Sequence, residues 1–265
     1  MNLEKLTLSA VDAAHQAAQF IKQESKNFDQ SKVEHKGLHD LVSYVDKNAE
    51  QILVELLQKS LPDCGFITEE STVQQSNREF NWIIDPLDGT TNFIHGLPCY
   101  CVSLGLMHQN ELIVGVVHEI NFNESFYAWK GGGARLNQKP IHVSRNSQLS
   151  QSLLATGFPY TNYSRMQEYM HVFDYCMRNT RGLRRLGSAA ADLAYVACGR
   201  LDGFFEYGLK AWDVAGGALL VKEAGGMVAD FCNENNFIFG EEIVACNAAI
   251  FNEFMEVIKS AFHSS

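Results

Sequence analysis

Residues 82–93 read Trp-Ile-Ile-Asp-Pro-Leu-Asp-Gly-Thr-Thr-Asn-Phe, and the chain changes from apolar to acidic within this stretch. The apolar run 82–84 is typical of a buried strand, and Pro86 is expected to end it, so that the chain turns at Asp85. A second carboxylate, Asp88, follows three residues later. The stretch therefore predicts a corner at which a strand brings acidic groups to one edge of a sheet.

The residues after the two acids have two interpretations. Gly89 allows the backbone to approach a ligand closely, and Thr90 adds a hydroxyl group beside it. Asp-Pro and Asp-Gly are also common turn signals, and Asp88 could simply hydrogen-bond its own backbone. The corner becomes a functional candidate only in combination with acids elsewhere in the chain.

The composition is that of an ordinary soluble globular protein. The chain has 265 residues, 46% of them apolar, which is enough for a substantial core in one large domain or two small ones. A formal net charge of −10 and a pI near 5.3 argue against a surface that neutralises nucleic-acid phosphates by itself. An acidic protein that handles phosphate is therefore expected to use metal ions.

Several absences bear on location and on the kind of metal. The first residues lack a basic stretch followed by an apolar one, and no run approaches the roughly 18 apolar residues of a membrane span. The seven cysteines include no C-x-x-C pair, which fits a reducing compartment better than a disulfide framework. The nine histidines show no zinc-site spacing, whereas oxygen-ligated metal stays open. We expect a cytoplasmic protein with no membrane contact.

Hydrophobic periodicity predicts helices and strands that alternate along the whole chain. Asp46 is expected to cap the second helix, residues 108–110 predict a hairpin, and the glycines at 131–133 predict a tight turn. We find no linker and no change in composition, so residues 1–265 are predicted to form one layered α/β domain. The predicted helices are 3–24, 46–57, 165–178, 189–198, 213–224 and 251–262, and the predicted strands are 66–68, 82–84, 100–107, 111–119, 124–129, 136–143, 152–156, 182–186, 203–206, 227–230 and 243–246.

Two further acids follow a predicted strand or begin a predicted helix. Glu69 could be a solvated loop charge, and Asp213 could be a helix N-cap, a role worth about 1 kcal/mol. Strand ends present ligands at one edge of a sheet, so we expect both acids to join Asp85 and Asp88 in holding Mg²⁺. Two such ions about 3.5–4 Å apart can clamp a phosphoryl group. The four acids thus predict hydrolysis of a phosphate ester.

The same motifs carry a family resemblance. Asp-Pro-Leu-Asp-Gly-Thr-Thr-Asn-Phe at 85–93, Glu-Glu at 69–70, Trp-Asp-Val-Ala-Gly-Gly at 212–217 and Glu-Ala-Gly-Gly at 223–226 resemble the inositol monophosphatase family. The similarity runs over nearly the whole chain, and residues 183–190 look especially like the bacterial SuhB-type members. The resemblance implies an αβαβα layered sandwich and a Mg²⁺-dependent, lithium-sensitive phosphatase that forms a homodimer.

The resemblance also implies roles for individual residues. Glu69, Asp85 and the carbonyl of Leu87 would hold one Mg²⁺, and Asp85, Asp88 and Asp213 a second, with two or three ions in total. The implied catalytic residues are Glu69, Asp88 and Thr90, with Thr90 and Glu69 orienting the water that attacks phosphorus. The implied substrate-binding residues are Asp88, Gly89, Thr90, Arg184, Ala189, Glu206 and Asp213. Glu206 would bind substrate hydroxyls, the amides of Gly89 and Thr90 would receive phosphate oxygens, and Lys36 and Asp46 match supporting positions.

The substrate and a second role stay open at this point. The expected substrate is myo-inositol 1-phosphate or a similar small polyol monophosphate, with fructose 1,6-bisphosphate, 3′-phosphoadenosine 5′-phosphate and histidinol phosphate as alternatives. Resemblance to SuhB-type members also implies a protein or RNA partner in the transcription antitermination machinery. The arginines at 181, 184 and 185 either serve such a partner or form a solvated basic face.

Overall fold

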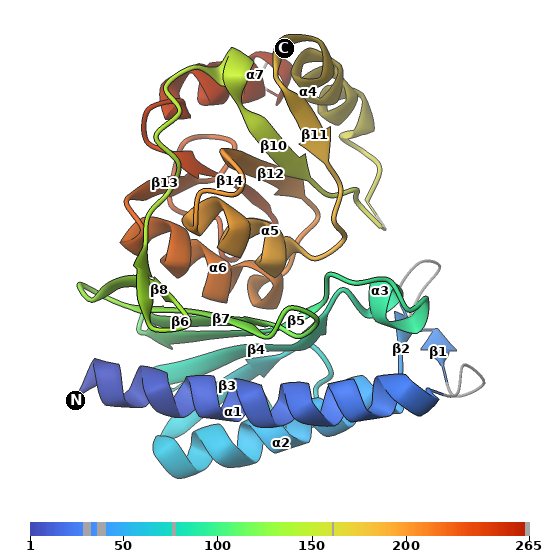
Figure 1. Cartoon of the computed structure of the whole chain (residues 1–265), viewed down its shortest axis with the longest axis vertical. Helices are drawn as coiled ribbons and strands as arrows, with labels where there is room; N and C mark the ends of the chain where they lie inside the picture. The colour runs from blue at the N-terminus through green and yellow to red at the C-terminus, as the bar shows by residue number, and fades with distance from the viewer. Residues whose placement is uncertain (29–32, 36–40, 76–77, 161, 263–265) are drawn as a thin grey trace.

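The computed structural model describes residues 1–28, 33–35, 41–75, 78–160 and 162–262, and these form five stacked layers (Figure 1). Helices α1 (Leu3–Glu24) and α2 (Tyr44–Ser60) form one outer layer, and α4 (Met166–Asn179) and α7 (Phe251–Phe262) form the other. Helices α5 (Ala189–Ala197) and α6 (Ala211–Glu223) form the middle layer between two sheets. The predicted αβαβα sandwich is therefore confirmed.

The larger sheet lies between α1/α2 and the middle layer. Its strand order is β3-β4-β5-β6-β7-β8-β9, and only the β3–β4 pair among these neighbours is parallel. The predicted hairpin at 108–110 is confirmed as the connection between β5 and β6. The strands are β3 (Cys64–Thr68), β4 (Phe80–Asp88), β5 (Cys101–His108), β6 (Glu111–Glu119), β7 (Glu124–Trp129), β8 (Gly133–Leu136) and β9 (Lys139–Ile141).

The smaller sheet lies between the middle layer and α4/α7. Its order is β11-β10-β12-β14-β13, with β10 parallel to both of its neighbours. Short elements complete the described chain. The remaining elements are β10 (Leu153–Thr156), β11 (Gly182–Arg184), β12 (Gly203–Tyr207), β13 (Gly226–Ala229), β14 (Glu242–Asn247), the pair β1 (Glu34–His35) and β2 (Leu41–Val42), α3 (Thr90–Ile94), and the 3₁₀ turns η1 (Ser25–Asn27) and η3 (Leu149–Gln151).

Two predictions about strand ends are wrong, each for a local reason. Strand β4 does not stop at Asp85 but continues to Asp88, because a bulge between these two residues removes the pairing that Pro86 could not make. The predicted strand 136–143 is instead two strands, because Asn137 and Gln138 adopt positive φ and reverse the chain.

The N-cap prediction for Asp46 is wrong, and the N-cap alternative for Asp213 does not hold either. Both acids stand three residues after the residue that caps their helix, and both accept a hydrogen bond from that earlier residue's backbone. Asp46 Oδ2 accepts from the amide of Ser43 at 2.9 Å, and Asp213 Oδ2 accepts from the amide of Lys210 at 2.6 Å. The acids therefore serve the helix start from inside the first turn, as in a capping box.

Close packing fixes α6 against the larger sheet. A Cβ added to Gly115 of β6 would lie 2.5 Å from the carbonyl oxygen of Gly216, and one added to Gly105 of β5 would lie 2.6 Å from the Cβ of Ala215. Such approach is possible only without side chains at these positions. The N-terminus of α6, and with it Asp213, is thereby set in place relative to the sheet.

Among the described residues, none of the helices combines the length and the apolar character needed to cross a bilayer.

Candidate active site

A cavity of about 290 Å³ opens where the two sheets and the middle helices meet. Its wall includes the end of β4 and the first residues of α3, α5 and α6, so three helix N-termini border one space. Unpaired amides and the helix dipole make each N-terminus favourable for negative charge. The setting therefore suits an anion such as phosphate.

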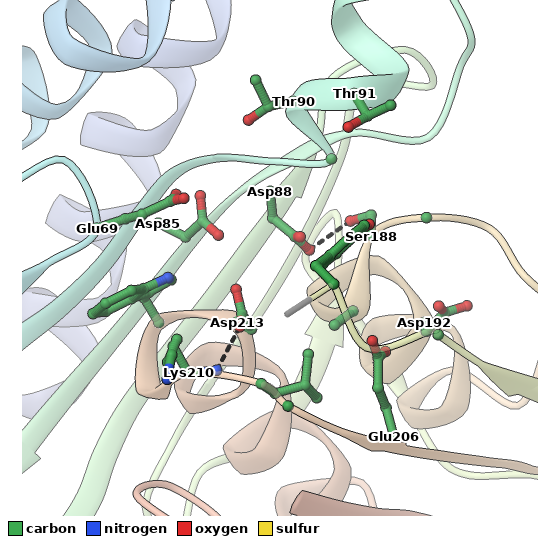
Figure 2. A pocket seen from close by; sticks show the side chains of 18 of the residues that line it. Glu69, Asp85, Asp88, Thr90, Thr91, Ser188, Asp192, Glu206, Lys210 and Asp213 are labelled. Atoms are coloured by element: carbon green, nitrogen blue, oxygen red, sulfur yellow. Dashed lines mark hydrogen bonds between the residues drawn. The ribbon is translucent and has the colours of Figure 1, made fainter. Parts of the chain in front are cut away.

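Carboxylates converge on one side of this cavity (Figure 2). Oxygen atoms of Asp85, Asp88 and Asp213 all lie within 4.8 Å of one another. Glu69 also lines the cavity, and it lies close enough to Asp85 to raise the pKa of that carboxyl group. The acids that were predicted to meet from distant parts of the sequence are thus brought together.

Two acids of the cluster, Asp85 and Asp88, are oriented by hydrogen bonds from backbone amides and from one hydroxyl group. The amide of Leu87 donates to Asp85 Oδ1 at 2.9 Å across the bulge. Asp88 Oδ2 accepts from the Ser188 hydroxyl at 2.6 Å and from the amide of Ala190 at 2.7 Å. Both bonds fall on Oδ2 and together fix the orientation of the Asp88 carboxylate. The first turn of α5 thereby helps to position a residue of the larger sheet.

The buried carboxylates of the cluster repel one another, and a bound cation would relieve this repulsion. Burial first, and then the charges of Glu69 and Asp88, raise the pKa of Asp85 well above its usual range. Burial likewise raises the pKa of Asp88, against the opposing effect of its hydrogen bonds. The donors are all oxygen atoms, which Mg²⁺ prefers. The residues present therefore fit a hard divalent cation.

Thr90 is held beside the cluster at the start of α3. Its hydroxyl lies 2.9 Å from Asp46 Oδ1 and 2.9 Å from the carbonyl oxygen of Leu87, and can donate to either. Gly89, which precedes it, has φ +95°, and a Cβ there would lie 3.0 Å from the carbonyl oxygen of Cys99. Gly89 is therefore the residue type that this turn requires.

The other side of the cavity is lined by groups of mixed charge. Glu206 and Ala189, for which the family resemblance implied substrate-binding roles, both lie in this wall. Arg184 does not belong to the cavity lining: it is exposed, and the neighbouring Arg185 lines the cavity instead. Alternation along the extended β11 segment sends adjacent side chains in opposite directions, which is why an assignment one residue off misses the site. Lys36 lies outside the described residues.

Sequence reasoning missed several residues of the site. Asp192 and Tyr160 line the cavity, and Glu50 is a buried acid that binds the loop after Glu69. A charged residue in the alanine-rich segment 189–198 was a signal that could have identified Asp192, because a charge is costly to bury in such a helix. Glu50 gave no comparable signal, since acids are common in helical first turns.

A second acidic group lies elsewhere. Oxygen atoms of Asp230 and Glu242 and the sulfur of Cys232 lie within 4.8 Å of one another. Asp230 accepts hydrogen bonds from the amides of Cys232, Glu234 and Asn236, so it organises a loop. Glu242 pairs with Arg165. These local hydrogen bonds and the ion pair explain why the three side chains lie close together, without a bound metal ion.

The family model described as "Inositol monophosphatase family" matches residues 2–264 of the chain. The chain belongs to the inositol monophosphatase family. The metal-binding chemistry indicated by the acid cluster is in keeping with a family of phosphatases that generally depend on metal ions.

Relatives in this family carry two kinds of name. The chain is 42% identical over 242 residues to "Nus factor SuhB" of Escherichia coli strain K12, covering 91% of each chain. It is 37% identical over 250 residues to "Inositol-1-monophosphatase" of Mesorhizobium japonicum, covering 94% of each. Both a phosphatase and a Nus factor are therefore found at similar distance from this chain.

Solved structures agree with the fold. The extragenic suppressor protein suhB from Bartonella henselae superposes with a TM-score of 0.90 at 36% identity, covering 96% of this chain and 98% of that one. The inositol monophosphatase from Anabaena superposes with a TM-score of 0.87 at 35% identity, covering 98% of each.

Proposed function

We propose that this protein is a Mg²⁺-dependent phosphatase that hydrolyses myo-inositol 1-phosphate or a similar small polyol monophosphate. The observation that carries the proposal is the convergence of Asp85, Asp88 and Asp213, with Glu69 beside them, in a cavity bordered by three helix N-termini. Family membership and the relative named inositol-1-monophosphatase support the same reaction.

The proposed ligands of two or three Mg²⁺ ions are Glu69, Asp85, the carbonyl oxygen of Leu87, Asp88 and Asp213. When bound, Mg²⁺ supplies positive charge against the phosphate and lowers the pKa of a coordinated water. The protein itself contributes position: Asp88 is oriented by the first turn of α5, and Asp213 by the packing of α6.

The proposed attack on phosphorus is by water, with no covalent enzyme intermediate. Thr90 and Glu69 orient that water, and the Thr90 hydroxyl is itself held by Asp46 and the Leu87 carbonyl. The amides of Gly89 and Thr90 receive phosphate oxygens at the start of α3. Glu206 and Ala189, in the opposite wall, contact the alcohol part of the substrate.

The charge of the cavity wall favours a polyol monophosphate over the alternative substrates that carry a second phosphate. Asp192 and Glu206 are buried in the wall remote from Glu69, so a second phosphate of fructose 1,6-bisphosphate would meet two acids there. The aromatic residues in the described cavity wall are Tyr160 and Trp212, and the substrate panel tests whether either accepts a nucleoside base. A panel of inositol 1-phosphate, fructose 1,6-bisphosphate, 3′-phosphoadenosine 5′-phosphate and histidinol phosphate tests the preference.

The proposal is tested by phosphate release from inositol 1-phosphate with and without Mg²⁺. We expect Mg²⁺-dependent turnover by the wild type and its loss in Asp88→Asn. The matched control is Asp174→Asn, which changes an exposed aspartate paired with Arg178 and should keep wild-type turnover. Wild-type turnover in Asp88→Asn would refute the assignment of the acid cluster.

We propose a transcription-related role as a second candidate, because the Escherichia coli relative is named Nus factor SuhB. Strand β11 is an edge of the smaller sheet, and Arg181 and Arg184 are exposed on it or beside it. These arginines offer positive charge to a protein or RNA partner of the antitermination machinery. Binding of such a partner by Asp88→Asn but not by an Arg181→Glu/Arg184→Glu variant would support this role, and no binding by the wild type would remove it.

The remaining family properties are part of the same proposal. They are a homodimer, lithium sensitivity, a cytoplasmic location and one catalytic domain spanning residues 1–265. The site combines residues of both sheets and of the helices between them, which supports the last of these. Sedimentation, inhibition by LiCl and localisation of the tagged protein test the first three.

A further inference from the structure

The cavity contains a second pair of acids on the side away from Glu69. Figure 2 shows Asp192, from α5, and Glu206, from β12, near one another in this part of the cavity. Both are buried, at 1% and 6% exposure. Neither belongs to the Asp85–Asp88–Asp213 group, so this pair needs an explanation of its own.

Asp192 lacks the partners that a structural aspartate would have. Its Oδ1 atom is buried and accepts no hydrogen bond in the described part of the chain. An unpaired buried acceptor costs about 1–3 kcal/mol, and more for a charged group. Asp192 also lines the cavity, so a bound ligand can supply a hydrogen-bond donor to its carboxylate and offset part of this cost.

Glu206 is held in the same wall by close contact with the backbone. A Cβ added to Gly157 would lie 2.0 Å from Glu206 Oε2, so the carboxylate rests where only glycine leaves room. Burial first, and then the charges of Asp192 and Asp213, raise the pKa of Glu206 well above its usual range. The structure thus places two acids side by side against their electrostatic preference.

The surroundings limit what this pair can bind. The nearby cation, Arg185, donates to the Tyr160 hydroxyl at 2.7 Å and stacks over the rings of Phe158 and Tyr160. It makes no ion pair with a described carboxylate. Two acids with one arginine at the rim favour hydrogen-bond donors without negative charge, and hydroxyl groups meet that requirement.

We infer that Asp192 is a specificity-determining residue that, together with Glu206, accepts hydrogen bonds from two hydroxyls of the polyol part of the substrate. The inference rests on the proposed function, which is hydrolysis of a phosphate ester. It adds the residue that determines which alcohol group of the ester is recognised. Asp192 contacts the substrate on the side remote from phosphorus.

The experiment compares two esters in the Asp192→Asn and Asp192→Ala variants. Inositol 1-phosphate carries the hydroxyls, and phenyl phosphate has none. We expect kcat/KM for inositol 1-phosphate to fall about 10-fold to 100-fold further than kcat/KM for phenyl phosphate, as for loss of a hydrogen bond to a charged acceptor. Among monodeoxy analogues of inositol 1-phosphate, one should be insensitive to the substitution, which identifies the hydroxyl bound.

Thermal unfolding separates this role from a structural one. Removing an unpaired buried carboxyl group should leave the melting temperature of both variants equal to or above that of the wild type. The matched control is Asp202→Asn, because Asp202 accepts from the Ser144 hydroxyl at 2.5 Å and from the amide of Leu153 at 2.7 Å. This control should melt lower and keep the wild-type ratio between the two esters.

Binding of inositol 1-phosphate, measured by calorimetry with Mg²⁺, makes the inference independent of turnover. If the wild type binds this ester but does not hydrolyse it, the proposed function fails, and weaker binding by Asp192→Ala still supports the inference. Equal losses for both esters in the Asp192 variants, a lowered melting temperature without a change in the ratio, or no binding by the wild type would overturn it.

Discussion

Asp85 and Asp213 bring their carboxylates into one cluster from two different layers of the fold. Asp85 lies at the bulge of β4 in the larger sheet, whereas Asp213 lies in the first turn of α6 in the middle layer. Their meeting depends on how closely α6 packs on the sheet, which Gly105 and Gly115 permit. The site is therefore a product of packing between layers.

Asp213→Asn should abolish activity while leaving the metal-free protein at least as stable as the wild type. Asparagine keeps an oxygen for the Lys210 amide but removes one charge from a cluster whose acids raise the pKa of Asp85. We expect kcat to fall on the order of 100-fold or more, and the Mg²⁺-induced rise in melting temperature to shrink. Phosphate release measures kcat, and calorimetry with and without Mg²⁺ measures the melting temperature; a wild-type response to Mg²⁺ would contradict the assignment.

Glu50→Gln should weaken metal binding although Glu50 is no proposed ligand. Glu50 accepts from the amide of Glu70 at 2.8 Å and from the amide and hydroxyl of Thr72, each at 2.7 Å, and so fixes the loop that follows Glu69. Glutamine offers one acceptor oxygen, so part of this loop is released at a cost of about 1–3 kcal/mol. Urea unfolding and the Mg²⁺ dependence of activity are the measurements. If the Mg²⁺ dependence of activity were unchanged, Glu50 would not be needed to hold Glu69 in position.

Gly115→Ala should reduce both stability and activity. The added methyl group would lie 2.5 Å from the carbonyl oxygen of Gly216 and push α6 away from β6. We expect a loss of about 1–3 kcal/mol in the free energy of unfolding, with a lower kcat because Asp213 moves with α6. Gly131→Ala is the control: no atom lies within 4 Å of its added Cβ, and at φ +75° it should lose about 1 kcal/mol without loss of activity.

His118 should make stability fall in mild acid. Burial first, and then the nearby His15 and Lys22, lower the pKa of His118 from 6.5 to about 3. Between these values the unfolded chain binds a proton that the folded chain does not, so stability decreases as pH falls through this range. The slope is about 1.4 kcal/mol per pH unit at most. In urea unfolding at several pH values, His118→Gln should show a shallower slope; an unchanged slope would assign it to other groups.

The main features of the fold were predictable because they follow from short-range patterns. Apolar periodicity identified α1 and α7 with their observed ends and the hairpin between β5 and β6. The ends that were missed depend on pairing. Strand β4 continues past Pro86 because a bulge accommodates the missing hydrogen bond, and the local sequence does not predict a bulge.

The site was predictable to the extent that its motifs are contiguous. The corner at Asp85 and Asp88 and the helix start at Asp213 were recognisable, and the structure brings them together. Asp192 and Arg185 were not identified, because their place in the cavity depends on how β11 and α5 approach β4. That approach is a long-range contact, which spacing along the chain does not encode.

The position of α6 between the two sheets also orders events during synthesis on the ribosome. When β3 to β9 have emerged, Asp85 and Asp88 are present, but the inner face of their sheet still lacks its covering helix, which is made much later. A cation cannot be fully enclosed until Asp213 leaves the exit tunnel and α6 docks. Metal loading at the proposed site would accordingly follow the docking of α6 on the larger sheet.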